Sequence, residues 1–286
     1  MLAQVRGTTI YFDIEGAGLV PDGPTMRERP VAMVIHGGPG GDHTGFKPGM
    51  SPLADVMQLL YFDHRGQGRS GRGDPARYTL DENVEDMEAL RRNLGLGPVV
   101  SIGTSYGGMV AMAHAARHPK AVSKLILIVT AAHAGFMPRA EQFVRSHGTA
   151  EQRRACERLW SGTFETADQM AEYYAAMGPL YSRRYVPAAA EAVRSRATYS
   201  PEPLNRAFGP GGVLRSFDLR AEIAGIAVPT LVLAGRLDWI CPPEFSKEIH
   251  RLIPGSRLQI FEDSSHSIRA DEPDALNAAI RDFITG

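Results

Sequence analysis

The sequence of 286 residues predicts an α/β domain in which a mostly parallel, doubly wound sheet is interrupted by a helical insertion. Short apolar runs alternate with amphipathic helical patterns in both the N-terminal and the C-terminal parts of the chain. This alternation is typical of βαβ units joined by right-handed crossovers. Between them, the apolar runs stop and only helical patterns remain. We therefore expect a sheet domain over residues 1–133 and 221–286, with the insertion over residues 134–220.

Six short apolar runs are the expected strands. Several are rich in β-branched residues, and their length and apolar character are typical of strands that are buried on both faces of a parallel sheet. The last run follows a Pro254-Gly255 turn. The six runs are Val31–Ile35, Leu59–Phe62, Val99–Ile102, Leu125–Val129, Thr230–Ala234 and Arg257–Phe261.

The expected helices lie between these runs. Thr79 and Glu82 form a capping-box pattern at the start of the first helix. Apolar residues then recur every three or four positions as far as Leu94, and Gly95 ends the helix. Further helical patterns run from Met109 to Ala116, from about Glu244 to Ile253, and onward from Pro273.

Composition excludes several classes of protein. The net charge is −1 and the cationic residues form no basic face, so a nucleic-acid partner is not expected. No apolar run approaches the roughly 20 residues of a membrane span. The N-terminus lacks a signal-peptide pattern, so we expect a cytoplasmic protein without membrane contact. Cys156 and Cys241 lack metal-ligand spacing and are expected to be buried thiols.

The strongest chemical signal is the G-x-S-x-G sequence from Gly103 to Gly107, between a predicted strand and a predicted helix. In such a nucleophile elbow the serine occupies a strained turn, and the glycines let strand and helix approach each other. The positive end of the helix dipole then faces the oxyanion that develops during the reaction. This context favours a catalytic role for Ser105 over a chance match.

A glycine-rich turn, His36–Gly41, follows the first expected strand. The N–H of Gly38, together with that of Tyr106, would form an oxyanion hole. A phosphate-binding loop would continue with Lys and Ser or Thr, whereas Asp42 and a histidine follow here. Residues 66–71 match G-x-G-x-x-G, but the sequence continues as a loop, so no dinucleotide site is expected there.

A serine nucleophile needs a base and an orienting acid, in the chain order serine, acid, histidine for this type of elbow. Asp238 follows the expected strand Thr230–Ala234, and His266 follows the last expected strand. Functional groups gather on such loops at the carboxyl ends of strands. We expect His266 to accept the proton of Ser105, and Asp238 to fix the tautomer of His266.

On these motifs and on the Asp63–Ser70 segment, the sequence resembles the α/β-hydrolase superfamily, and within it the proline iminopeptidase-like branch. The resemblance covers the predicted sheet domain. It implies an eight-stranded sheet, a helical cap formed by residues 134–220, and a serine hydrolase that needs no cofactor and no metal. It also implies that Asp63 and Arg65 fix loops and take no part in the chemistry.

Two positions depart from this branch. Its aminopeptidases hold the ammonium group of the substrate with acidic side chains, one directly after the catalytic aspartate and one in a cap stretch resembling Gly-Pro-Asn-Glu. Here Trp239 follows Asp238, and the comparable cap position holds Gly212 or Ala207. A buried ammonium without a carboxylate partner is costly. The other acids of the insertion that could replace it are Glu141, Glu172, Glu191 and Glu202.

The expected reaction is hydrolysis of an ester, lactone or amide of a small, largely uncharged molecule through an acyl-enzyme on Ser105. Two alternatives remain open: an aminopeptidase that releases N-terminal proline, and a ligand-binding protein that keeps the fold without catalysis. The presence of all the expected catalytic residues argues against the latter. Apolar and aromatic side chains are expected to line the substrate pocket: Phe136, Met137, Trp160, Tyr173, Tyr174, Met177 and Trp239.

Overall fold

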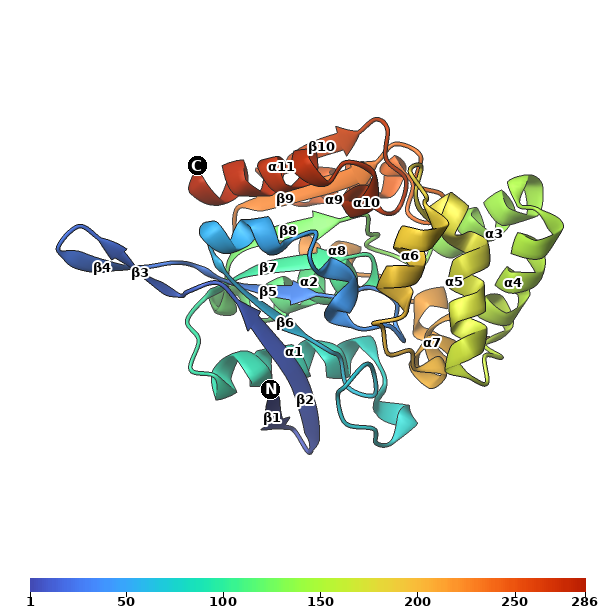
Figure 1. Ribbon diagram of the computed structural model, residues 1–286, viewed down its shortest axis with the longest axis horizontal. Helices are drawn as coiled ribbons and strands as arrows, with labels where there is room; N and C mark the ends of the chain where they lie inside the picture. The colour runs from blue at the N-terminus through green and yellow to red at the C-terminus, as the bar shows by residue number, and fades with distance from the viewer.

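The computed structural model describes residues 1–286. An eight-stranded sheet forms the centre of the molecule (Figure 1). β1 (Leu2–Val5) and β2 (Thr8–Glu15) are antiparallel and occupy one edge. The other six strands are parallel to one another. In spatial order these six are β6 (Gln58–Phe62), β5 (Val31–Ile35), β7 (Val99–Thr104), β8 (Val122–Ile128), β9 (Thr230–Gly235) and β10 (Arg257–Phe261).

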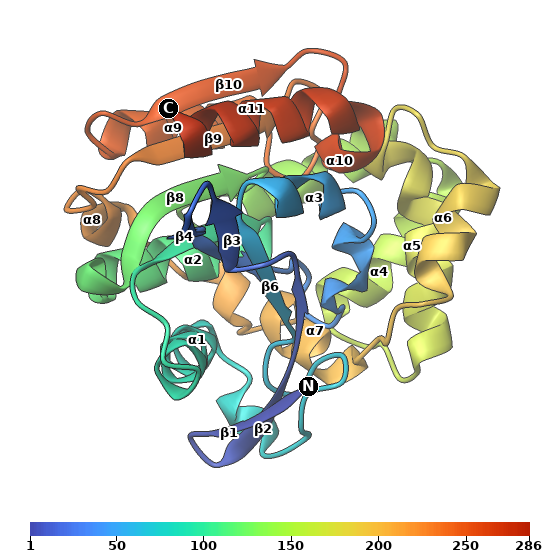
Figure 2. The same ribbon diagram turned by 60° about the vertical axis from the view of Figure 1, so that its left-hand side comes forward.

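Two hydrophobic cores lie on the opposite faces of this sheet, because successive side chains of a strand point to opposite sides. In β5, Met33 and Ile35 enter one core, whereas Ala32 and Val34 enter the other. Helices cover both faces (Figures 1 and 2). The first core packs against α1 (Leu80–Asn93), α2 (Tyr106–Arg117) and α9 (Pro243–Leu252), and the second against α11 (Pro273–Thr285).

The expected parallel strands and the helices between them are confirmed, with ends that shift by a few residues. The capping box is only half formed. The Thr79 hydroxyl accepts a hydrogen bond from the N–H of Glu82 at 3.2 Å, but the Glu82 carboxylate is held by arginines, among them Arg6 and Arg77. Ion pairing with neighbouring elements therefore replaces the second half of the box.

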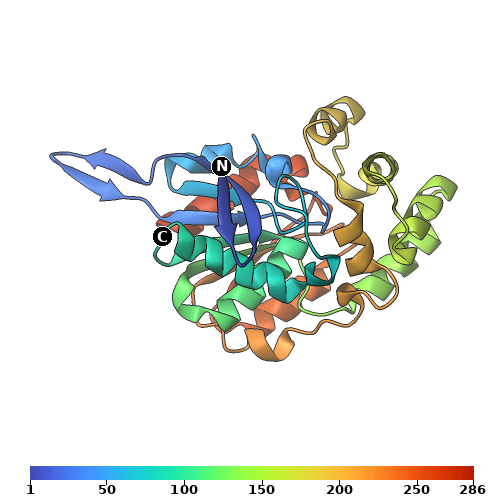
Figure 3. The same cartoon turned by 90° about the horizontal axis from the view of Figure 1, so that it is seen from below.

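A two-stranded hairpin, absent from the predicted elements, projects from the body of the molecule (Figures 1 and 3). It consists of β3 (Leu19–Asp22) and β4 (Thr25–Glu28), paired antiparallel and almost wholly exposed to solvent. Its strands carry no alternating apolar pattern, which is the signal by which a half-buried strand is recognised in a sequence.

Between β8 and β9 the chain forms a group of helices beyond the carboxyl ends of the strands (Figure 1). The two ends of this excursion are joined at a narrow neck: Ala134 donates to the carbonyl of Phe217 at 2.9 Å, and Leu219 donates to the carbonyl of Ala132 at 2.8 Å. The helices are α3 (Phe136–His147), α4 (Ala150–Ser161), α5 (Ala167–Tyr181), α6 (Pro187–Arg194) and α7 (Pro201–Phe208), followed at the neck by α8 (Arg220–Ile223).

A buried histidine joins α1 to α2. The side chain of His114 is fully buried, and its Nε2 lies 3.1 Å from a carboxylate oxygen of Glu88. The other ring nitrogen has no hydrogen-bond partner. Burial lowers the pKa of His114 to about 4, although the Glu88 carboxylate acts in the opposite direction. The folded protein therefore keeps this ring neutral where the unfolded chain would protonate it.

This difference predicts a pH-dependent stability. Between the ordinary histidine pKa of about 6.5 and about 4, the unfolded chain binds a proton that folded His114 does not, so the free energy of unfolding falls as the pH decreases through this window. The loss is on the order of 3 kcal/mol. In His114→Gln, urea unfolding at several pH values should lack this contribution, whereas His147→Gln, which replaces an exposed histidine, serves as control. An unchanged pH dependence in His114→Gln would contradict the assignment.

Candidate active site

Ser105 lies on a sharp turn between β7 and α2. Its φ is 55° and its ψ is −121°, a strained conformation for a residue with a side chain. Two hydrogen bonds hold the turn: the N–H of Ser105 donates to the Ile128 carbonyl at 2.9 Å, and the Thr130 hydroxyl donates to the Ser105 carbonyl at 2.7 Å. The surrounding strands thus fix the strained backbone and present the hydroxyl of Ser105 at the end of the sheet.

Glycines make this turn sterically possible. A Cβ at Gly103 would lie 2.3 Å from the carbonyl oxygen of Gly107, and a Cβ at Gly107 would lie 2.2 Å from the carbonyl oxygen of Ile35. A Cβ at Gly108 would meet the side chain of Thr130 at 2.6 Å. A side chain at Gly103 or Gly107 would push α2 away from β7 or β5, and one at Gly108 would clash with Thr130 after β8, so the predicted reason for the glycines is confirmed.

The His36–Gly41 turn lies against Ser105. A Cβ at Gly37 would be 3.2 Å from the Cβ of Ser105, and Gly38 has a φ of 113°, which favours glycine. The N–H of Gly38 donates to no protein acceptor. Tyr106 is the first residue of α2, so its N–H has no acceptor within the helix. Both residues line the same cavity as Ser105.

Both ring nitrogens of His36 form hydrogen bonds to the backbone that support this turn. Its Nε2 accepts a hydrogen bond from the N–H of His64 at 3.1 Å, and its Nδ1 therefore donates to the Gly37 carbonyl at 2.7 Å. Burial lowers the pKa of His36, which keeps the ring neutral in this arrangement. These two hydrogen bonds connect the turn to the loop that contains His64.

His266 and Asp238 are hydrogen-bonded to each other. The Nδ1 of His266 donates to one carboxylate oxygen of Asp238 at 2.8 Å, because a carboxylate only accepts. The other oxygen accepts from the N–H groups of Ile240 and Cys241 at 2.8 and 3.0 Å. The Asp238 side chain is fully buried. These bonds fix the ring and leave its Nε2 as the nitrogen that can accept a proton.

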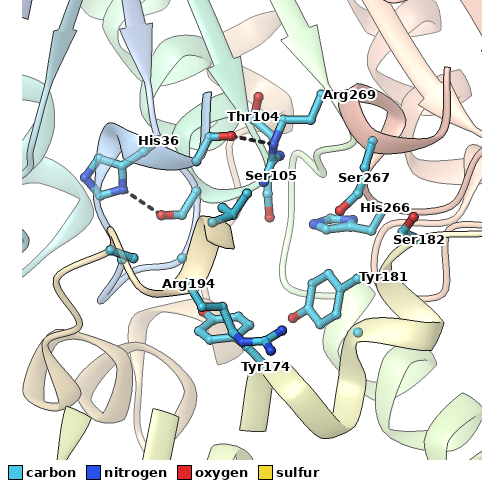
Figure 4. A pocket seen from close by; sticks show the side chains of 18 of the residues that line it. His36, Thr104, Ser105, Tyr174, Tyr181, Ser182, Arg194, His266, Ser267 and Arg269 are labelled. Atoms are coloured by element: carbon cyan, nitrogen blue, oxygen red, sulfur yellow. Dashed lines mark hydrogen bonds between the residues drawn. The ribbon is translucent and has the colours of Figure 1, made fainter. Parts of the chain in front are cut away.

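Ser105 and His266 open into one cavity of about 640 Å³ between the sheet and the helical insertion. Figure 4 shows their side chains pointing into it, with Tyr174 and Tyr181 on the opposite wall. Asp238 lies behind the histidine and does not line the cavity. The aromatic residues expected from the sequence to line it do so: Phe136, Trp160, Tyr173, Tyr174 and Trp239.

Two residues expected in the pocket do not line it. Met137 is buried within the core, because successive residues of a helix project about 100° apart and Phe136 takes the cavity side. Met177 is turned toward α4, where its sulfur lies 3.7 Å from the sulfur of Cys156. Both methionines are therefore buried packing residues, and Met177 packs within the insertion.

The charge of the cavity was missed by the sequence analysis. Four cationic residues line it: Lys47, Arg184, Arg194 and Arg269. Its only carboxylate is that of Asp42, which already accepts hydrogen bonds from Thr44, Arg69 and Thr198. These four residues come from loops and helices that are distant in sequence. Only Arg269, three residues after His266, has a position in the sequence that indicates a place near the site.

The acids considered as partners for a substrate ammonium do not line the cavity. Glu141 pairs with Arg215 at 3.1 Å, Glu172 lies 3.6 Å from Arg158, and Glu191 pairs with Arg194 at 2.6 Å. Glu202, in the first turn of α7, is absent from the lining residues as well. The structure therefore supplies no free carboxylate to the cavity.

Asp63 and Arg65 each fix a loop next to the site. Asp63 accepts hydrogen bonds from His43 and from the N–H of Arg69, and Arg65 donates twice to Asp86 at 2.6 Å. The structural role implied by the resemblance is confirmed, although the two residues act through different partners. The glycines of the G-x-G-x-x-G match serve the same loop, since a Cβ at Gly68 would lie 2.3 Å from Asp63.

Three further features bear on function. No group of three or more His, Cys, Asp or Glu side chains is arranged to hold a metal ion. None of the helices combines the length and the apolar character needed to cross a membrane. Cys156 and Cys241 are free and buried, as expected from their spacing.

The family model described as the alpha/beta hydrolase fold matches residues 30–273. The chain belongs to the α/β-hydrolase family. This hydrolase is 31% identical over 287 residues to the proline iminopeptidase PfmaB of Pestalotiopsis fici, covering 96% of this chain and 98% of that protein. It is 29% identical over 277 residues to a proline iminopeptidase of Saccharolobus solfataricus, covering 88% and 84% respectively.

Among solved structures, the hydrolase is similar to the enol-lactonase from Burkholderia xenovorans LB400. The TM-score is 0.73 at 25% identity, and the match covers 100% of both chains. The fold class and the resemblance to the proline iminopeptidase-like branch are thereby confirmed.

The elbow of this hydrolase predicts a strong steric effect. Gly107→Ala places a methyl group against the backbone of β5, which cannot move aside, and should destabilise the protein by about 2 kcal/mol or more. Gly97→Ala is the control, because a Cβ there meets no atom within 4 Å. Urea unfolding of both variants measures the difference. Equal stability of the two variants would contradict the steric role of Gly107.

Proposed function

We propose that this hydrolase cleaves an ester, lactone or amide bond of a small molecule through an acyl-enzyme on Ser105. The observation that carries the proposal is the shared cavity of Ser105, on its strained elbow, and His266, held by Asp238. A positioned nucleophile, a base and an orienting acid are the three parts that this chemistry needs. We further propose that residues 134–220 act as a cap, since helices α3 to α7 contribute much of the cavity wall.

In the proposed mechanism the Nε2 of His266 takes the proton of Ser105 while the serine oxygen attacks the substrate carbonyl. The carbonyl oxygen becomes an oxyanion, and the N–H groups of Gly38 and Tyr106 donate to it. His266 then protonates the leaving group, and a water molecule activated by the same nitrogen releases the acyl group. Asp238 keeps the ring in the required tautomer and stabilises the imidazolium that forms.

A second candidate is an aminopeptidase that releases N-terminal proline, and the names of the two curated relatives favour it. Such a substrate brings an ammonium group into the cavity. The only lining carboxylate, that of Asp42, is engaged by Arg69 and other donors, and Trp239 occupies the position after Asp238. A cation–π contact with Trp239 contributes about 0.5–2 kcal/mol, less than a buried charge pair. We therefore favour substrates without a positive charge.

The mechanism predicts that Ser105→Ala loses turnover by about 10⁴-fold or more while it keeps its fold. Initial rates on p-nitrophenyl esters, together with thermal unfolding, measure both quantities. A fluorophosphonate should label Ser105 in the wild-type protein, and peptide mapping should find no label in the variant. Turnover by Ser105→Ala at the wild-type rate would refute the mechanism. Ligand binding without turnover by the wild-type protein would instead favour a non-catalytic role.

The charge of the cavity predicts the choice between the two candidates. The value of kcat/KM for prolyl-p-nitroanilide should be at least about 10-fold below that for its N-acetylated form, because the free ammonium lacks a carboxylate partner. Trp239→Glu places an acid at the position where the related aminopeptidases carry one, and should raise the ratio of the free to the acetylated substrate. A wild-type preference for the free amine would establish the aminopeptidase instead.

A further inference from the structure

Two of the four cations that line the cavity, Arg184 and Arg269, form no ion pair within the protein, and only one of them is shielded from solvent. Lys47 pairs with Asp13 and Glu15, and Arg194 pairs with Glu191 at 2.6 Å. Arg269 forms no ion pair, although it lies close to the proposed catalytic residues, three positions after His266. Arg184 also lacks a pair, but it is exposed to solvent, where water satisfies the charge.

The guanidinium group of Arg269 is oriented by the protein but only partly satisfied. Its Nε donates to the Gly45 carbonyl at 3.0 Å, and the group lies over the ring of Phe46, 5.7 Å from the ring centroid. Neither terminal nitrogen donates to a protein acceptor. Burial lowers the pKa of Arg269, and no neighbouring carboxylate acts in the opposite direction. The side chain is thus a fixed cation with both of its terminal N–H₂ groups available.

We propose that the substrate of this hydrolase carries a carboxylate group and that Arg269 binds it. The proposal rests on the proposed hydrolase function and adds the charge of its substrate. A fixed guanidinium with two free terminal nitrogens matches the two oxygens of a carboxylate. An anion at this point also removes the cost of a partly buried charge without a partner. The expectation of a largely uncharged substrate is therefore replaced by that of an anionic one.

The arrangement of the cavity supports this proposal. Figure 4 shows Arg269 on the side of Ser105 and His266, and Arg194 on the facing wall beside Tyr174 and Tyr181. Arg194 is paired with Glu191, so it is the unpaired charge of Arg269 that gives this end of the cavity a positive potential, which attracts an anion and repels an ammonium. The aromatic wall then contacts the apolar part of the substrate. A carboxylate on Arg269 would hold the substrate at the end of the cavity where the reaction takes place.

Two matched pairs of esters test the proposal. The first pair is the mono-p-nitrophenyl ester of adipic acid and its methyl ester, which places the carboxylate on the acyl group. The second is meta-carboxyphenyl butanoate and its methyl ester, which places it on the leaving group. In at least one pair, the wild-type protein should prefer the anion by about 10-fold or more in kcat/KM, the effect of a charged hydrogen bond.

The variants assign this preference to one residue. Arg269→Gln should lower the ratio of anion to neutral ester by about 10- to 100-fold. Arg269→Lys keeps the positive charge but loses the two parallel N–H donors. Its ratio of anion to neutral ester should lie between those of the wild type and Arg269→Gln. Arg183→Gln is the control, because it removes an exposed positive charge that does not line the cavity. It should keep the wild-type ratio. An equal ratio in wild type and Arg269→Gln, or a wild-type preference for the neutral ester in both pairs, would overturn the proposal.

A binding measurement separates this proposal from the proposed function. Calorimetric titration with adipate should detect binding to the wild-type protein and to Ser105→Ala. Binding to Arg269→Gln should be at least about 10-fold weaker, because the variant lacks the charged hydrogen bonds to the carboxylate. Adipate binding without ester turnover would uphold the anion site and refute the hydrolase. Turnover of neutral esters without adipate binding would uphold the hydrolase and refute the anion site.

Discussion

The steric contact between β5, β7 and α2 is the constraint on which the site depends. With no Cβ at Gly103 or Gly107, the start of α2 lies directly against both strands. This contact forces the backbone of Ser105 into its strained conformation and places the first N–H of the helix beside the serine. It also brings the turn that contains Gly38 to the same point. The proposed nucleophile and the proposed anion-binding N–H groups are thereby positioned by rigid backbone, with little side-chain freedom to lose when a substrate binds.

Electrostatics divides the site into two parts with different tasks. Behind the histidine, Asp238 is fully buried and its oxygens accept three hydrogen bonds. These bonds hold the carboxylate charge next to the ring of His266. In front, the cavity has an excess of cations and an arginine without a partner. The shared fold of the relatives therefore does not determine the substrate, and we expect cavity side chains such as Trp239 and Arg269 to select it.

The sequence predicts the parallel sheet and the chain order of Ser105, Asp238 and His266 because both leave strong local signals: apolar runs of strand length, and motifs at the ends of those runs. The β3–β4 hairpin gives no such signal, since it is solvated on both faces. Met137 was misassigned because the direction of a helical side chain depends on how the helix packs. Arg269 was overlooked because the absence of an ion-pair partner is a property of the folded molecule and not of any local pattern.

The neck between β8 and β9 has a consequence for how such proteins diversify. The two chain ends that leave the sheet there are already held together by the bonds of Ala134 and Leu219. The sheet therefore already holds the two ends of the insertion together. The entropy lost on closing this loop grows only slowly with the length of the intervening segment. Helices between these two points can be exchanged, lengthened or lost as one module during evolution, which would reshape the wall that faces Ser105 while the elbow beneath it stays intact.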